Sequence, residues 1–173
     1  MAILVRKIER TKWVVSQETD YANADVLSLC LFTRNNELSF WRIPGEEAIN
    51  EGIIAMVSGQ DHIQRTHVVL LDEADLIGED VAITESPGAA ASPELAKMHR
   101  DLSRLTAKSM LSVSSLIVKA FKEKGKVRTL TESEVKKIMQ KAFDDGRFDP
   151  DRLKPSVRKK LDKEYAARVA LEA

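Results

Sequence analysis

The residues best suited to chemistry are the acids that follow the apolar run at residues 68–71. Asp72, Glu73 and Asp75 stand close together at the end of a stretch whose β-branched residues predict a strand. Carboxylate oxygens are the ligands that Mg²⁺ and Ca²⁺ prefer. One hypothesis is therefore a metal site at these three residues, and the other is an acidic surface turn.

The same run, Val-Val-Leu-Leu-Asp-Glu-Ala-Asp at residues 68–75, resembles the Asp-Glu-Ala-Asp box of helicase-type ATPases. The resemblance implies a strand that delivers one acid to magnesium and a second acid that orients water. Such an ATPase also needs a glycine-rich loop ending in Gly-Lys-Ser or Gly-Lys-Thr, because backbone amides and a lysine must hold the phosphates. Gly125 and Lys126 are followed by Val127, so the sequence does not predict an ATPase.

The remaining reactive residue types form no recognisable catalytic or zinc-binding pattern. The three histidines and the single cysteine, Cys30, lack the paired spacing that encloses zinc. Ser58 lies near Asp61 and His62 in the sequence, but a serine nucleophile needs a strained turn of the Gly-x-Ser-x-Gly kind. The sequence therefore indicates no catalytic residue and no cofactor.

Charge is divided between the two parts of the chain. The protein has 27 basic and 27 acidic side chains, yet residues 1–93 contain 7 basic and 15 acidic ones, a net charge of −8. Residues 94–173 contain the other 20 basic and 12 acidic ones, a net charge of +8. The basic part could bind nucleic acid or another polyanion, it could pack against the acidic part, or the division could reflect an ordinary solvated surface.

Some of the basic residues are explained without a ligand, because cations near the end of a helix complement its dipole. The loop that follows the first predicted helix of the basic part, and the last helix of the chain, have no such explanation. A helix-turn-helix motif fits poorly, since the turn at residues 144–149 is long and acidic. We expect any non-specific polyanion contact at Lys124, Lys126, Arg128, Arg158, Lys159 and Lys160.

The first part of the chain, residues 1–85, is predicted to be an acidic α+β module with a small mixed or antiparallel sheet and one helix. Glu46 and Glu47 precede an apolar stripe at helical spacing, which predicts the helix at residues 46–58. Asn35 and Asn36 tolerate positive φ and predict a two-residue hairpin turn. The predicted strands are residues 2–8, 13–15, 25–32, 38–43, 66–71 and 80–84.

A linker rich in alanine, glycine and proline, residues 86–93, leads into a basic module of three helices at residues 94–173. The first helix is predicted to run over residues 94–122. Thr131 and Glu134 form a capping-box pattern that begins the second. The third is expected to begin between residues 149 and 155 and to continue toward the C-terminus.

One apolar stripe on the first of these helices is a candidate interface. Leu95, Met98, Leu102 and Leu105 recur at intervals of three, four and three residues, which places them on one helical face. A long apolar stripe of this kind is typical of a docking surface or a homo-oligomer. We therefore expect these four residues to contact a protein partner or a second copy of the chain.

The sequence leads to the hypothesis of a non-catalytic cytoplasmic protein that works through protein-protein contacts, as a regulator, an antitoxin- or immunity-like protein or an assembly subunit. A single cysteine and an N-terminus without a signal-like apolar core favour the cytoplasm, and no apolar stretch approaches the ~20 residues that cross a bilayer. The first alternative is a nucleic-acid-binding protein that uses the basic helical part. The second is a metal-dependent enzyme that uses the acids at residues 72–75.

Overall fold

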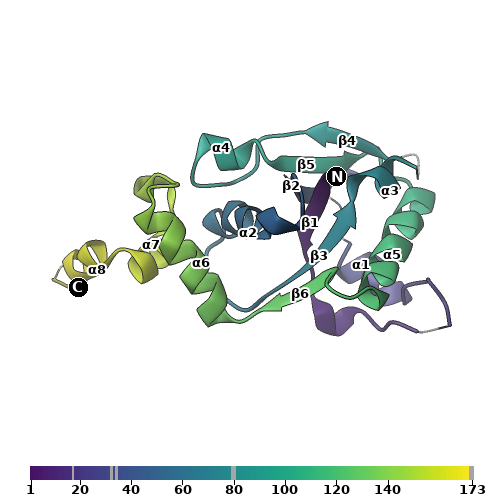
Figure 1. Cartoon of the computed structure of the whole chain (residues 1–173), viewed down its shortest axis with the longest axis horizontal. Helices are drawn as coiled ribbons and strands as arrows, with labels where there is room; N and C mark the ends of the chain where they lie inside the picture. The colour runs from purple at the N-terminus through teal and green to yellow at the C-terminus, as the bar shows by residue number, and fades with distance from the viewer. Residues whose placement is uncertain (17, 32, 34, 79–80, 172–173) are drawn as a thin grey trace.

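The structure, a computed structural model, describes residues 1–16, 18–31, 33, 35–78 and 81–171 (Figure 1). Its strands are β1 (Ile3–Lys7), β2 (Leu38–Ile43), β3 (Thr66–Asp72), β4 (Ala82–Glu85), β5 (His99–Ser103) and β6 (Val127–Leu130). Its helices are α1 (Ala24–Leu29), α2 (Ile49–Ser58), α3 (Glu73–Ile77), α4 (Pro93–Ala96), α5 (Ala107–Lys122), α6 (Glu132–Asp144), α7 (Pro155–Leu161) and α8 (Lys163–Leu171). Short 3₁₀ turns are η1 (Arg10–Lys12), η2 (Glu46–Ala48) and η3 (Pro150–Arg152).

The strands form one six-stranded sheet in the order β4-β5-β2-β1-β3-β6, and all neighbouring strands are antiparallel. In the central strand β1, Ile3 and Val5 are buried on one face and Leu4 on the other, as the alternation of a strand requires. Because both faces of the sheet are apolar, each must be covered by other elements. The chain is therefore a mixed α+β fold, as the sequence predicts.

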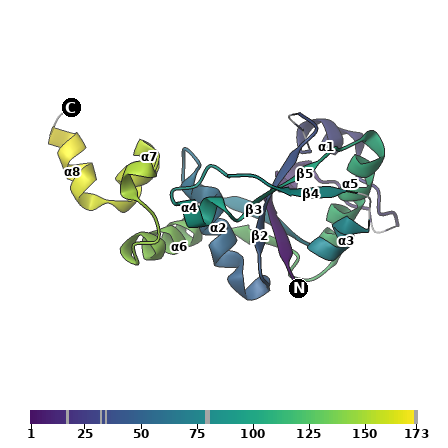
Figure 2. The same cartoon turned by 90° about the horizontal axis from the view of Figure 1, so that it is seen from above.

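Two helical layers cover the sheet, and Figure 2 shows the strands between them. The α2 layer, made of α2, α4, α6 and α7, buries residues such as Ile53, Leu95 and Met139 against one face. The α5 layer, made of α1, α3, α5 and described residues after η1 such as Trp13 and Ala22, buries residues such as Val26 and Ile117 against the other. Among the described residues, no helix is both long enough and apolar enough to cross a bilayer.

The prediction of a central strand at residues 25–32 is wrong, because α1 occupies residues 24–29; Phe32 lies outside the described residues. A short apolar run does not distinguish a strand from a helix, and in this run Val26 and Leu31 are buried in the core. Asn35 and Asn36 do adopt positive φ values of 56° and 59°. They lead from a loop into β2, so the turn forms without the predicted hairpin.

The predicted helix at residues 94–122 is divided into α4, β5 and α5. Leu102 lies opposite Leu38 in the sheet, and Arg104 turns the chain with a left-handed φ of 59°. Thr106 then begins α5 with its own capping box: its hydroxyl accepts from the Ser109 amide, and the Ser109 hydroxyl accepts from the Thr106 amide. Because β5 and the turn after it are short, the apolar residues from Leu95 to Leu105 recur at helical spacing although they belong to different elements. The sequence pattern therefore resembles that of one long helix.

The predicted linker at residues 86–93 does not separate two modules. It connects β4 to β5, which are neighbours in the sheet, and β6 from the basic part pairs with β3 from the acidic part. The domain boundary is therefore corrected: both parts of the chain build one sheet. The capping box of Thr131 and Glu134 is confirmed at the start of α6, and α7 and α8 follow within the predicted last helical region.

Candidate functional site

The three acids of the proposed metal site do not gather around a common point. Asp72 accepts a hydrogen bond from Lys126 at 3.1 Å, whereas Glu73 receives paired hydrogen bonds from the Arg42 guanidinium at 2.9 and 3.1 Å. Asp75 is exposed on α3. In the described ranges no three His, Cys, Asp or Glu side chains are arranged to hold a metal ion, so the prediction of a metal site at these residues is not supported.

Lys126 instead lies at the centre of an ion-pair network between the acidic and basic parts of the chain. Its ammonium group is 3.1 Å from Asp72 and 3.2 Å from Glu46, and Arg128 contacts the second oxygen of Glu46 at 3.1 Å. Burial alone would lower the pKa of Lys126, but its hydrogen bonds to the two acids raise it above its ordinary value. Lys126 is therefore held charged by the protein itself.

Further ion pairs connect the two parts elsewhere: Arg100 with Glu85, Lys122 with Asp20, and Arg147 with Glu51. The two opposite net charges are thus partly neutralised within one molecule. Of the three interpretations of the charge division, this arrangement favours packing of the basic part against the acidic part.

The six residues expected to bind a polyanion do not form one surface. Lys126 and Arg128 are engaged as described, Arg158 pairs with Asp151 and Asp162, and Lys160 pairs with Glu132. Lys124 and Lys159 are exposed and form no ion pair with a described residue. Figure 1 shows α7, which carries Lys159, at the opposite end of the molecule from the connection between α5 and β6.

The four residues of the candidate interface belong to the protein's own core. Leu95 packs under α4 in the α2 layer, with Met98 half-buried beside the same core. Leu102 and Leu105 are buried on the other face of the sheet, in the α5 layer. The stripe is therefore divided between two cores and does not form the exposed face that the sequence predicts.

A cluster of Ser86, His99 and Asp101 has the residue types of a catalytic triad, and the sequence analysis missed it. Ser86 Oγ lies 2.8 Å from His99 Nδ1 and donates a hydrogen bond to Asp101, whose other oxygen accepts from Ser39 at 2.9 Å. In a triad the histidine lies between serine and acid, so that it can take the serine proton. Here the serine lies between the other two, so the order of the relay is wrong.

The surroundings of this cluster also indicate a structural role. The His99 ring meets the Trp41 ring edge to face, with 5.0 Å between ring centroids. A Cβ atom on Gly88 would lie 2.5 Å from the Trp41 ring and 2.7 Å from His99, so only glycine allows the loop to pack this closely. The cluster joins β2, β5 and the chain that leaves β4.

The other nucleophiles are placed structurally as well. The Ser58 hydroxyl donates to the Ala55 carbonyl and accepts from the Ala91 amide, which ties the end of α2 to the loop before α4. Cys30 follows α1, half-buried, and burial raises the pKa of its thiol. Neither residue is activated as a nucleophile.

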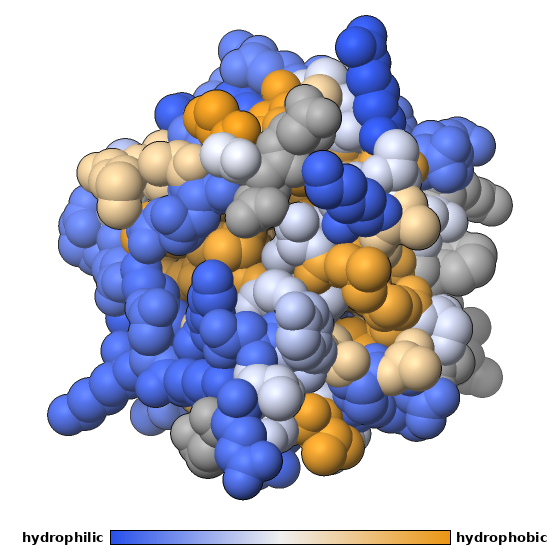
Figure 3. Space-filling model, turned by 90° about the vertical axis from the view of Figure 1, so that its right-hand side faces the viewer, coloured by the Kyte–Doolittle hydropathy of each residue, from blue (hydrophilic) through white to orange (hydrophobic). Residues whose placement is uncertain are grey.

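The exposed apolar side chains are concentrated on one layer. The large hydrophobic residues exposed within the described ranges are Met1, Val14, Tyr21, Ile77 and Leu111. Val14 and Tyr21 follow η1 in the chain, and next to Val14 the Trp13 ring stacks on the Phe121 ring of α5. Met1 is next to Ala2, whose carbonyl accepts a hydrogen bond from the Glu73 amide at the start of α3. Figure 3, which views this end of the molecule, shows apolar groups exposed among polar ones.

Ile77 and the beginning of α5 border a surface hollow. Ile77 is 65% exposed at the end of α3, and Leu111 is 49% exposed on α5. The hollow has a volume of about 360 Å³ and is lined by Ile77, Val81, Ala82, Arg104, Thr106, Lys108 and Ser109. We call this hollow with Leu111 the α3–α5 surface. The sequence contains no sign of it, because it depends on which residues of two separate helices stay outside the core.

Comparison of the chain with protein-family models, with characterised proteins and with solved structures found no match.

Proposed function

We propose that this protein acts by binding another protein through the α3–α5 surface. The observation that carries the proposal is the exposure of two large aliphatic side chains: Ile77 lines the hollow, and Leu111 follows one turn after Lys108, which also lines it, on α5. The other leucine and isoleucine side chains that the structure describes are buried or half-buried. Exposed apolar surface of this kind is costly in water and is a common feature of protein interaction sites.

The backbone next to the hollow supports the same proposal. Arg104 adopts a left-handed φ of 59°, which costs a side-chain-bearing residue ~1 kcal/mol or more. This conformation aims the β5–α5 connection so that Arg104 lines the hollow together with Lys108. The turn from β5 into α5 therefore also places two cationic side chains at the hollow.

The chemistry of the surface defines the kind of partner. Ile77, Val81 and Ala82 are the apolar side chains that line the hollow. Arg104 and Lys108 form no ion pair with a described residue. A protein segment that inserts an aliphatic side chain and carries acidic residues beside it would match both properties. A cytoplasmic location, expected from the single cysteine, belongs to this proposal.

Site-specific photo-crosslinking in cells tests the proposal. A photo-reactive amino acid at position 111 should yield one discrete adduct, whereas the same group at Lys159, exposed on α7, should not. Ile77→Asp in the position-111 protein should reduce the adduct about tenfold, because loss of a central apolar anchor commonly costs more than about 1.4 kcal/mol of binding.

The outcomes separate clearly. An adduct with the mass of two chains would identify a second copy as the partner, and a different mass would identify another protein. Equal adducts from positions 111 and 159, or none from position 111, would contradict the proposal. Circular dichroism of Ile77→Asp controls for folding, since this exposed residue should tolerate the change.

A further inference from the structure

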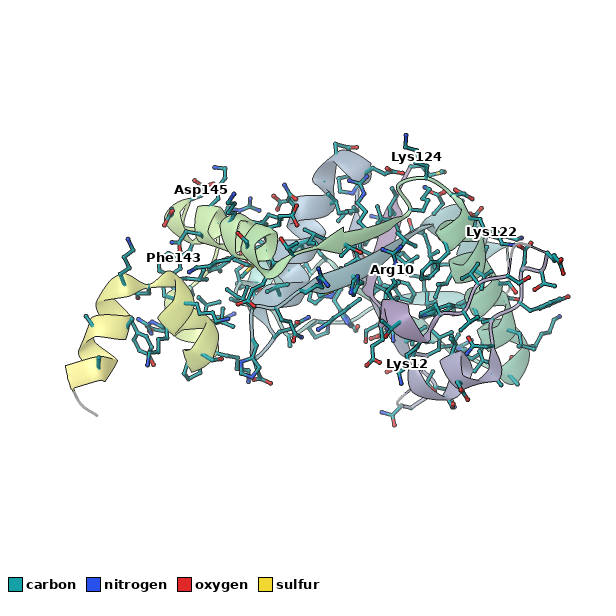
Figure 4. All side chains as sticks on the ribbon, turned by 90° about the horizontal axis from the view of Figure 1, so that it is seen from below. Arg10, Lys12, Lys122, Lys124, Phe143 and Asp145 are labelled. Atoms are coloured by element: carbon teal, nitrogen blue, oxygen red, sulfur yellow. The ribbon has the colours of Figure 1, made fainter. Side chains whose placement is uncertain are left out.

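A group of cationic and polar side chains meets at the open edge of the sheet, where β3 and β6 pair. We call it the edge cluster: Arg10 from η1 and His67 from β3 both contact Thr129 from β6, and Arg65, two residues before His67, adds a nearby positive charge. Arg10 Nη1 donates to the Thr129 hydroxyl at 3.0 Å, and His67 Nδ1 lies 2.9 Å from the same oxygen. Figure 4 shows Arg10 beside these strands.

Unlike the ion-paired cations of the molecule, the cations of the edge cluster have no acid partner among the described residues, a property that they share with exposed cations such as Lys124 and Lys159. Lys126, Arg147 and Arg158 each contact one or two carboxylates. In contrast, neither Arg10 nor Arg65 forms an ion pair with a described residue. Two guanidinium groups beside one imidazole repel each other, so an anion bound there would remove an unfavourable interaction.

The donors of the cluster are also free to reach a ligand. Arg10 uses one nitrogen on Thr129, and no hydrogen bond joins its other guanidinium nitrogens to a described residue. Arg10, Arg65 and Thr129 are exposed. Guanidinium groups bind phosphate through paired hydrogen bonds, and hydroxyl groups often provide an additional donor.

We propose that the edge cluster is a binding site for a phosphate group. The phosphate is either that of a small molecule or that of a nucleic-acid backbone, since both present the same oxygens. This site differs from the polyanion surface expected from sequence, because its cations come from η1 and β3 in the acidic part of the chain. It does not depend on the α3–α5 surface.

The pKa of His67 can report on an anion bound at the edge cluster. Burial lowers the pKa of His67, and the nearby charges of Arg10 and Arg65 lower it further. An anion placed between these groups would act in the opposite direction and raise this pKa. Titration of the His67 ring by NMR, with and without phosphate, therefore reports on the site without any assay of activity.

Two binding measurements test the proposal on the full chain. Inorganic phosphate is compared with chloride at equal ionic strength in thermal unfolding, because a ligand of the folded state raises its stability. Short single-stranded RNA of mixed sequence is tested by fluorescence anisotropy over a salt series. The test variant is Arg10→Ala/Arg65→Ala, and the matched control is Lys154→Ala/Lys159→Ala, which removes two exposed cations at the other end of the molecule.

We expect phosphate to stabilise the protein and to raise the pKa of His67, with both effects lost in the test variant and retained in the control. If the source is nucleic acid, RNA also binds, and the test variant weakens binding at least about tenfold. Phosphate binding without RNA binding would assign the site to a small molecule.

Two results would overturn the proposal: no specific effect of phosphate together with no RNA binding, or equal binding by the test and control variants. Arg65→Gln, which removes one exposed charge and no described contact, repeats the test if the double variant fails to fold.

Discussion

The two helical layers cover the same sheet and bury similar aliphatic cores, but their outer surfaces differ. In the α2 layer, ion pairs join neighbouring elements: Arg147 of the segment after α6 contacts Glu51 of α2, and Lys160 of α7 contacts Glu132 of α6. In the α5 layer, large apolar side chains such as Ile77 and Leu111 are exposed instead. One layer carries ion pairs between its elements, and the other exposes large apolar side chains.

The sequences of the two main outer helices explain the difference. α6 contains acidic and basic residues at helical spacing, so its surface can form pairs such as Lys141 with Asp145. α5 contains no acidic residue and several serines, which are poor helix formers. α5 is therefore stabilised mainly by the face that it buries, which includes Val113 and Ile117.

The largest expected effect distinguishes core from surface within the α5 layer. Leu102→Glu places a charge where the native side chain is 0% exposed, and the cost should approach the whole stability of the fold, about 5 to 15 kcal/mol. Leu111→Glu should change the free energy of unfolding by only about 0.5 kcal/mol. Circular dichroism and urea denaturation of both variants measure this contrast.

A folded Leu102→Glu protein with altered oligomeric mass would restore the interface that the sequence predicts. In that case, the assignment of this leucine to the internal core would have to be abandoned.

A smaller effect compares paired cations. Lys126→Met leaves Asp72 and Glu46 without their shared partner and should lower the free energy of unfolding by about 1 to 2 kcal/mol. Lys141→Met removes an exposed i,i+4 pair on α6 and should cost about 0.5 kcal/mol or less. The raised pKa of Lys126 means that its contribution persists through neutral pH and is lost only in strong alkali.

Urea denaturation at low and high salt checks this prediction. Equal losses in the two lysine variants would show that the network around Lys126 contributes no more than an ordinary surface pair.

The smallest expected effect concerns the pH dependence of His67. Its pKa in the folded protein is below the ordinary 6.5, so the unfolded chain takes up a proton more readily as the pH falls. The contribution of this residue to stability should therefore decrease as the pH falls from about 7 to about 5. His67→Gln should reduce that decrease, as measured by thermal unfolding in a buffer without phosphate. If the variant instead loses more stability than the unaltered protein as the pH falls, the predicted direction of the His67 effect is wrong.

The sequence predicts the fold class and the local signals well. Thr131 and Glu134 begin a helix as expected, and Asn35 and Asn36 adopt positive φ, because capping and turn chemistry depend on neighbouring residues. Residues 99–103 form a strand against the prediction, because their state depends on pairing with β2, far away in the chain. Local pattern cannot report such pairing.

The candidate sites show the same limit. The sequence correctly predicts that Asp72 and Glu73 lie at the end of a strand. It does not predict that Lys126 and Arg42 neutralise them, because only the folded sheet brings these cations close to the two acids. Likewise, Arg10 and Thr129 are distant in sequence and meet through β1, β3 and β6. Composition indicates how much charge a chain carries, whereas topology decides which charges stay unpaired.

The order of strands in the sheet has a consequence for synthesis on the ribosome. β1, β2 and β3 come first, and β1 pairs with both of the others. Their outer partners β5 and β6 are made later: Leu38 of β2 pairs with Leu102, and Thr66 of β3 pairs with Leu130. Until then the nascent chain presents two unpaired sheet edges and apolar faces that α5 and α6 do not yet cover, which invites aggregation. Folding of this protein should therefore depend on shielding of the growing chain until residue 130 has emerged.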